Sequence, residues 1–394
     1  MLPLENIKIL DLSRLAAGNM VSHMFADFGA DVVKVEKPGK GDDLRNWKIN
    51  GISHWWAVYS RNKRSISIDL KKDEGLALLK ELVKSADVFI ENFVPGTLEK
   101  WGIGPEQLGK LNKNLIILRI SGWGQTGIFK NAPGFGSLVE GMSGFAAMTG
   151  EEKQSPLLPP LALADMVAGL TGFGAILMAI LTSKKDNTGG QVIDLSLFEP
   201  FFSILGPWAA SYKISGKVPE RIGNRSNVAA PRGIYKTKDN KYVSLSASMQ
   251  SMWEKLALTI GSSDLIKDPR FLTNSDRLNN QDDLDKPISK FIKKYSREEV
   301  LNIFSKEGIT VGPVLDISEI IEHPYIKDRE VLIDHYNKEY GNVLMHQAFP
   351  RLSKTPGKIR HSAPSLGGDT DLVLKEIGIS EKQIQMLRKN KIIN

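Results

Sequence analysis

Short β-branched apolar segments alternate with helical patterns along the first 125 residues of the chain. The segments "NIKILDLS" (6–13) and "DVVKVEK" (31–37) have the composition of buried strands, and apolar residues such as Met20, Met24 and Phe28 recur between them at helical spacing. The alternation continues through "RSISIDL", "DEGLALLKELVKSA", "DVFIENF" and "NLIILRISGWG". Strands separated by helices predict βαβ units, and therefore a parallel sheet covered by helices.

Two later changes of pattern indicate further organisation. An apolar helix is expected from Asp165 to about Thr182, followed by the strand-like "QVIDLSLF", so the first domain should end near residue 200. The hairpin-like "GIYKTKDNKYVSLSAS", with Asp239 and Asn240 at its turn, and polar helices to about residue 305 predict a second, smaller domain. The tail from Pro324 carries short strands and a final amphipathic helix, whose packing the pattern leaves open.

The composition is that of an ordinary globular protein. At 394 residues, with 41% hydrophobic and 25% charged residues, the chain is long enough for about two domains. We expect a cytoplasmic protein without membrane attachment, because no secretory signal pattern is evident and apolar runs such as "LTGFGAILMAIL" are too short to span a bilayer. The absence of cysteine excludes disulfides, thiolate metal sites and a cysteine nucleophile.

The net charge of +7 is spread along the chain rather than gathered in one basic arm. Short basic groups occur at 61–64 ("RNKR") and 293–297 ("KKYSR"), without a nucleic-acid-binding motif. A solvated surface is therefore favoured over nucleic-acid binding, and a local phosphate site at one cluster is the alternative.

Common cofactor motifs are absent. "GFGSLVEG" has a misplaced third glycine and does not follow the first strand, so it does not predict a dinucleotide site. There is no G-x-x-x-x-G-K-[ST] loop, and "GMSG" is not a serine-hydrolase elbow. The six histidines are too scattered to indicate a metal site. We expect neither a metal nor a redox cofactor.

One carboxylate stands out against its surroundings. Asp165 lies in "LALADMVAG", inside an apolar run that continues into the expected helix. Local sequence favours an N-cap, whose side chain accepts hydrogen bonds from the first turn of the helix and contributes about 1 kcal/mol. A carboxylate at this position is also suited to nucleophilic chemistry, and the two roles are compatible.

The order of eight segments resembles the class III CoA-transferases, the family of formyl-CoA transferase and L-carnitine CoA-transferase, to which α-methylacyl-CoA racemase is related. The resemblance covers nearly the whole chain and rests on "ILDLSRLAAG", "ADVVKVEKPGKGD", "RNKRSISIDL", "DVFIENFVPGTLEKWG", "ISGWGQTG", "LADMVAG", "GITVGPV" and "APSLGGDTD". It implies an α/β protein: a large Rossmann-like CoA-binding domain with a parallel sheet formed from both termini (1–200 and 325–394), a linker (201–224), a smaller central α+β domain (225–324) and an interlocked homodimer.

The resemblance places the catalytic aspartate of the family on Asp165. Its carboxylate would attack an acyl-CoA thioester to give a mixed anhydride, and the released thiolate would then form an aspartyl-CoA thioester from which CoA passes to a carboxylic acid acceptor. Both intermediates preserve acyl activation if water is excluded. For CoA itself, the resemblance points to eight residues: Leu15, Lys37, Ile68, Leu70, Lys71, Asn92, Phe93 and Lys100. Core packing is the alternative role of the apolar members, and solvation that of the lysines.

Two alternatives keep the fold and change the function. An α-methylacyl-CoA racemase needs two bases beside the substrate, but its histidine would fall at Phe135 and its glutamate at Met249, and neither residue carries a proton. A non-catalytic acyl-CoA-binding protein is the other alternative, which an intact Asp165 disfavours.

The acceptor is expected to be larger than formate or oxalate. Ala16 stands where formyl-CoA transferase has a glutamine, and "SASMQSM" has no counterpart of that enzyme's glycine-rich loop. A dicarboxylate such as succinate, mesaconate or citramalate would fit, with Arg232 or Arg225 pairing its second carboxylate. An ordinary loop role for both arginines is the alternative.

Overall fold

The computed structural model describes residues 1–186 and 188–394 and divides into two compact units. The large unit comprises 1–143, 159–207 and 327–394, and the small unit comprises 144–158 and 208–326. Segment 144–158, which the sequence assigned to the large domain, groups with the small unit. The predicted linker 201–224 contains a helix, α10 (Trp208–Ser215).

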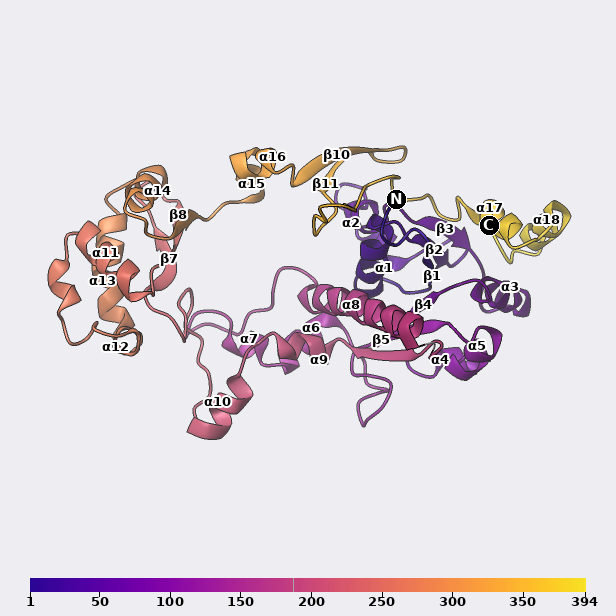
Figure 1. Ribbon diagram of the computed structural model, residues 1–394, viewed down its shortest axis with the longest axis horizontal. Coiled ribbons are helices and arrows are strands. Elements are labelled where there is room, and N and C mark those ends of the chain that lie inside the picture. Colours follow the sequence, from indigo (N-terminus) through magenta and orange to yellow (C-terminus); the bar gives the residue numbers. More distant parts are fainter. Residues whose placement is uncertain (187) are drawn as a thin grey trace. The chain divides into compact units, whose positions relative to one another are not determined.

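A six-stranded parallel sheet forms the centre of the large unit (Figure 1). Its strands stand in the order β3-β2-β1-β4-β5-β6, with Leu10 of β1 opposite Val33 of β2 and Phe89 of β4. The strands are β1 (Lys8–Asp11), β2 (Asp31–Glu36), β3 (Arg64–Ser67), β4 (Val88–Glu91), β5 (Ile116–Ser121) and β6 (Val192–Ser196). This order reverses direction between β1 and β4, as in doubly wound nucleotide-binding folds, which confirms the Rossmann-like prediction.

Helices cover both faces of this sheet. On one face, α1 (Ala17–Asp27) packs against α8 (Leu163–Asp186), and the two backbones approach closely because a Cβ at Gly169 would lie 2.6 Å from the Cβ of Met20. On the other face, α3 (Asp73–Val83) and α5 (Pro105–Leu111) bury Leu79, Leu82 and Leu108 in the main core. The predicted helices therefore cover the two faces of the predicted parallel sheet.

The C-terminal tail returns to the large unit, as the resemblance implied. Val373, Leu374 and Ile384, on α17 (Thr370–Glu376) and α18 (Glu381–Lys389), join the same core, and the amide of Asp69 donates to the carbonyl of Ile392. The remaining elements outside the small unit's core are η1 (Asp43–Asn46), α2 (His54–Tyr59), α4 (Thr97–Lys100), α6 (Gly136–Met142), α7 (Phe145–Met148), α9 (Phe198–Ser203), α15 (Ile317–Glu322), α16 (Pro324–Asp328), β10 (Leu332–Asn337) and β11 (Gly341–His346).

The small unit has its own core around a three-stranded antiparallel sheet. The predicted hairpin is confirmed, with Asn240 at its turn in the left-handed region (φ +59°). Trp253, Phe271 and Phe304 are fully buried beneath the sheet. Its elements are β7 (Arg232–Lys236), β8 (Tyr242–Ser246), β9 (Val311–Pro313), α11 (Gln250–Thr259), η2 (Ser263–Ile266), α12 (Asn274–Asn279), α13 (Gln281–Ile292) and α14 (Arg297–Lys306).

The apolar helix α8 is longer than the sequence pattern suggested. Its 24 residues begin before Asp165, and by length and composition alone the helix could cross a membrane. One side of α8 packs against the rest of the large unit, because Ala168, Gly172 and Ile176 are buried there. The opposite side carries the exposed apolar residues Met178 and Leu181.

Candidate functional site

A cavity of about 400 Å³ opens at the carboxyl ends of the first four strands of the large unit. Its walls come from the segments after β1, β2, β3 and β4, which places it beside the point where the strand order reverses. Parallel sheets bind their ligands in this crevice, because successive loops diverge there and leave space between them. The residues lining the cavity are Leu12, Ser13, Arg14, Val35, Glu36, Lys37, Gly41, Asp42, Ile68, Asp69, Leu70, Lys71, Phe93, Val94, Thr97 and Trp101.

Five of the eight residues predicted to bind CoA line this cavity: Lys37, Ile68, Leu70, Lys71 and Phe93. They come from three separate loops, so the fold gathers residues that lie up to 56 positions apart in sequence (37 to 93). A shared cavity is a stronger reason to group them than any of their local patterns.

The other three predicted residues lie outside the cavity wall. Asn92 exchanges two hydrogen bonds of 2.8 Å with the backbone of Arg14. Leu15 occupies the loop between β1 and α1 with a left-handed backbone (φ +61°). Lys100 is exposed at the last residue of α4. Asn92 and Leu15 thus adjoin a lining residue, whereas no direct role is visible for Lys100.

Two lining residues that sequence reasoning missed complete the aromatic and cationic wall. The rings of Phe93 and Trp101 meet edge to face at 5.2 Å, and the guanidinium of Arg14 lies 5.9 Å from the Phe93 ring. Arg14, Lys37 and Lys71 place three cationic side chains around the cavity. Aromatic faces and cations suit a ligand with a flat ring system and phosphate groups.

Asp165 lies in the first turn of α8, in the same unit as the cavity, and is partly exposed. Gly136, the first residue of α6, faces its carboxylate so closely that a Cβ there would lie 2.3 Å from Asp165 Oδ2. Any side chain at position 136 would displace the Asp165 carboxylate. The α6 backbone therefore forms one wall around the carboxylate.

The surroundings of Asp165 disfavour its charge. Burial and, to a smaller extent, the neighbouring Glu140 carboxylate raise the pKa of Asp165 to about 6, although the amides of Asp165 itself and of Ala17 oppose the shift. In the described part of the chain, no cation lies within ion-pair distance of Asp165. A carboxylate without a counter-ion keeps its basicity, and groups of this kind are typical of reaction sites.

The N-cap role that local sequence assigned to Asp165 belongs to another residue. Glu140 of α6 is 3% exposed, and its Oε1 accepts a hydrogen bond of 3.1 Å from the amide of Ala164 in the first turn of α8. Asp165 is the third residue of the helix, so it is not the cap. No local signal in "GFGSLVEG" indicates that Glu140 folds against a helix 24 residues later in the sequence.

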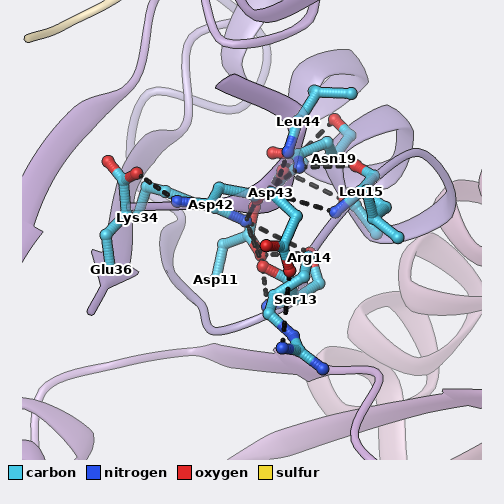
Figure 2. A network of polar contacts seen from close by, with 12 residues as sticks. Asp11, Ser13, Arg14, Leu15, Asn19, Lys34, Glu36, Asp42, Asp43 and Leu44 are labelled. Carbon is cyan, nitrogen blue, oxygen red and sulfur yellow. Dashed lines mark hydrogen bonds and ion pairs between the residues drawn. The ribbon is translucent and has the colours of Figure 1, made fainter. Parts of the chain in front are cut away.

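A polar network connects residues that line the cavity with buried residues behind them (Figure 2). Lys34 Nζ lies 2.9 Å from Asp42 Oδ2 and 3.2 Å from Asp11 Oδ1, and all three side chains are almost fully buried. Burial alone would raise the pKa of Asp42, but the Lys34 ammonium and the amides of Leu44 and Leu15 lower it below its ordinary value. Because Asp42 also lines the cavity, the network holds part of the cavity wall in place.

Of the residues considered for racemisation and for the acceptor, Phe135 adjoins Gly136 in the large unit, whereas Met249, Arg225 and Arg232 belong to the small unit. Phe135 precedes α6 and is 62% exposed, and Met249 precedes α11 and is 64% exposed. Arg225 pairs with Asp285 at 2.8 Å and with Asp282 at 2.7 Å.

Arg232 differs from Arg225 in having no acidic partner. It is exposed on β7, and no acid among the described residues lies within ion-pair distance of it. With regard to metals, the described residues contain no group of three or more histidine, aspartate or glutamate side chains that could hold an ion.

Comparison with known proteins gives one consistent result. A family model described as CoA-transferase family III matches residues 4–370. The chain is 35% identical over 396 residues to the succinyl-CoA–D-citramalate CoA-transferase of Chloroflexus aurantiacus, covering 99% of this chain and 98% of that protein. It is 36% identical over 400 residues to the beta subunit of the succinyl-CoA–L-malate CoA-transferase of the same organism, covering 100% of this chain and 98% of that subunit.

The fold agrees with a solved structure. The crystal structure of a CAIB/BAIF family protein from Brucella suis superposes with a TM-score of 0.84 at 32% identity, covering 95% of this chain and 99% of that one. The similarity in sequence and in structure therefore extends over nearly the whole chain and includes both compact units.

Proposed function

The chain belongs to CoA-transferase family III, and on that premise we propose that Asp165 carries CoA between an acyl-CoA donor and a dicarboxylic acid acceptor. The observation that carries this proposal is the state of Asp165: a partly exposed carboxylate that lies beside Gly136 and Glu140 and has no counter-ion among the residues that the structure describes. It lies in the same unit as a cavity with the chemistry for CoA.

In the proposed transfer, each step breaks one activated acyl bond and forms another. An oxygen of Asp165 attacks the thioester carbonyl, the C–S bond breaks, and a mixed anhydride and CoA thiolate result. The thiolate then attacks the Asp165 carbonyl of the anhydride, which releases the donor as its carboxylate and leaves an aspartyl-CoA thioester. The acceptor carboxylate repeats both steps in reverse order. Every activated bond is exchanged for another, so no nucleotide is hydrolysed.

The environment of Asp165 suits these steps. With a pKa of about 6, roughly nine-tenths of the group is ionised at pH 7, while its basicity exceeds that of an ordinary aspartate. The amide of Ala17, at the start of α1, donates to the carboxylate and would meet an oxygen that gains negative charge. Glu140 holds the first turn of α8 in place through the Ala164 amide.

The acceptor class follows from the relatives. The two Chloroflexus proteins named above are described as acting with succinyl-CoA on D-citramalate and on L-malate, both of which are dicarboxylic acids. We assign the second carboxylate of such an acceptor to Arg232, whose guanidinium has no acidic partner among the described residues, rather than to Arg225, which is held by Asp282 and Asp285.

We propose a second copy of the chain as the protein partner. Leu170, Met178 and Leu181 form an exposed apolar row on α8, although polar surface is expected on a helix that borders solvent. A homodimer would cover this row. Chromatography with light scattering tests this assignment, which a monomer at micromolar concentration would contradict.

Mass spectrometry tests the covalent step. The protein is incubated with a panel of acyl-CoA thioesters, treated with hydroxylamine to trap activated carboxylates as hydroxamates, and digested. We expect a hydroxamate on the peptide that contains Asp165, its loss in Asp165→Ala, and its retention in Asp186→Asn, a matched change at the exposed end of the same helix. An adduct on another peptide would contradict the assignment. No adduct together with α-deuterium exchange into a 2-methylacyl-CoA would favour a racemase.

A further inference from the structure

The loop between β1 and α1 joins the cavity to the nucleophile. Ser13 and Arg14 line the cavity, and Ala17, three residues after Arg14, begins α1. The start of α1 lies against the first turns of α8, because a Cβ at Gly169, one turn after Asp165, would lie 3.0 Å from the carbonyl oxygen of Ala17. The Ala17 amide is also one of the groups that lower the pKa of Asp165. Between them, Leu15 adopts a left-handed backbone (φ +61°) that residues other than glycine rarely take. Such a conformation persists only where its surroundings hold it in place.

Asn92, at the end of β4, holds the cavity side of this loop. Its Oδ1 accepts from the amide of Arg14 and its Nδ2 donates to the carbonyl of Arg14, each at 2.8 Å. These two bonds fix the peptide that carries a cavity-lining side chain. They make no contact with the helix that follows.

Two buried side chains hold the helix side (Figure 2). Asp42 Oδ1 accepts from the amide of Leu15 at 2.9 Å, and Asn19 Nδ2 donates to the carbonyl of Leu15 at 2.6 Å and to Asp42 Oδ2 at 2.8 Å. Both polar groups of the strained peptide unit are therefore bound by a linked pair of side chains. Asn19 and Asp42 are 0% and 2% exposed.

Two lysines fix this pair in turn. Lys34 Nζ lies 2.9 Å from Asp42 Oδ2, and Lys63 Nζ donates to Asn19 Oδ1 at 3.0 Å. Helix α1 has no side-chain cap of its own, because Ala16 occupies the N-cap position. The start of α1 is thus held by a side chain of its own first turn, Asn19, together with Asp42 from the segment after β2.

We infer that Asn19 and Asp42 are positioning residues, which hold the turn at Leu15 and thereby place the first amide of α1 against the carboxylate of Asp165. This inference rests on the proposed function. The two sets of hydrogen bonds therefore have different roles in one short loop. Those of Asn92 position Arg14 for ligand binding in the cavity, and those of Asn19 position the start of α1 for the reaction at Asp165. A small displacement of a donor at a reacting group is enough to slow the chemical step strongly.

Comparison of three asparagine variants tests the inference. We expect Asn19→Ala to lower kcat by about 10- to 100-fold while the KM for acyl-CoA changes less than about threefold. Asn92→Ala should show the reverse pattern, a raised KM with kcat within about threefold. The matched control is Asn112→Ala, which removes an amide that bonds the carbonyls of Val83 and Ala86 far from the cavity wall and should leave both constants unchanged.

The kinetic results distinguish failure of the positioning role from failure of the proposed function. If the wild type turns over and Asn19→Ala keeps its kcat, or if Asn19→Ala and Asn112→Ala lose kcat equally, the positioning role is overturned and the proposed function stands. If no thioester supports wild-type turnover, the proposed function itself fails. Should Asn19→Ala not fold by circular dichroism, Asn19→Ser supplies the same comparison, because its hydroxyl cannot span both the Leu15 carbonyl and Asp42.

Discussion

Two carboxylates of the large unit illustrate opposite uses of burial. At the floor of the cavity, Asp42 is 2% exposed and accepts from Lys34, Asn19 and two backbone amides, so its pKa is lowered despite burial. At the start of α8, Asp165 is partly exposed, but burial of its carboxyl and the neighbouring Glu140 raise its pKa to about 6, and no cation among the described residues lies within ion-pair distance to oppose them.

The difference lies in partners more than in depth. The deeper carboxylate is better stabilised in its charged form, because a lysine and three further donors replace the water it has lost. The shallower carboxylate keeps an unsatisfied charge next to a like charge, which costs stability and leaves it available to react. This contrast separates a structural acid, Asp42, from the acid that we propose as the nucleophile, Asp165.

The largest effect should come from removing the reactive carboxylate. We expect Asp165→Asn to lower kcat/KM by about 10⁴-fold or more, because the nucleophile is lost while the cavity is unchanged. Calorimetric titration with CoA should show an affinity within about threefold of the wild type. Substantial residual turnover would mean that another residue carries CoA, and equally reduced CoA binding would point to misfolding.

Stability should change in opposite directions at the two sites. Asp42→Asn leaves Lys34 without one of its buried partners and should lower the free energy of unfolding by about 3–5 kcal/mol. At Asp165, the folded pKa of about 6 lies above the model value of 3.8, so its charge weakens the fold as pH rises through that interval. Asp165→Asn should therefore raise the free energy of unfolding at pH 7, by up to about 3 kcal/mol before solvent screening reduces it.

Urea denaturation at pH 7 and at pH 4 measures both changes. The gain in Asp165→Asn should shrink at pH 4, where the wild-type carboxyl is already protonated in the folded state. A loss of stability in Asp165→Asn at pH 7 would show that the carboxylate has a stabilising partner and would remove the contrast with Asp42.

The pH dependence of turnover should reveal the influence of Glu140 on Asp165. With a pKa of about 6, wild-type kcat should fall below pH 6 and be about tenfold under its plateau at pH 5. In Glu140→Gln, loss of the neighbouring charge should shift this acid limb to lower pH, while the amide oxygen can still accept from Ala164. The pKa of this acid limb should stay above that of an ordinary aspartate, because burial raises the pKa of Asp165 more than Glu140 does. An unshifted limb would assign it to another group.

The strand pattern predicted the large unit well, because central strands such as β4 and β5 are buried along almost their whole length and consist mainly of apolar residues. Asp165 and five cavity residues were reached through a family resemblance carried by motifs next to strand ends. Glu140 and Arg14 were missed for a shared reason. Their roles depend on which helix or ring lies across from them, and no local spacing encodes a contact between α6 and α8 or between a loop and Phe93.

The N-cap prediction at Asp165 was wrong for a related reason. Its premise, that a helix begins just after an aspartate, ignored the possibility of a cap supplied by a distant glutamate. Once Glu140 accepts from Ala164, α8 can begin at Leu163, and the Asp165 carboxylate is released from capping. The tertiary contact thereby changes the role of a residue whose local sequence looks structural.

The smallest effect should extend the same contrast to the cations of the small unit. Arg225 resembles Asp42, since it is paired with Asp282 and Asp285, and Arg232 resembles Asp165, since no described acid pairs with it. If an unpaired charge indicates a ligand contact, Arg232→Ala should raise the KM for a dicarboxylate acceptor by about fivefold, roughly 1 kcal/mol, and leave a monocarboxylate acceptor unaffected. Arg225→Ala should lower the melting temperature and keep the ratio of the two KM values. Equal effects of both variants on that ratio would show that pairing alone does not distinguish structural from binding charges in this protein.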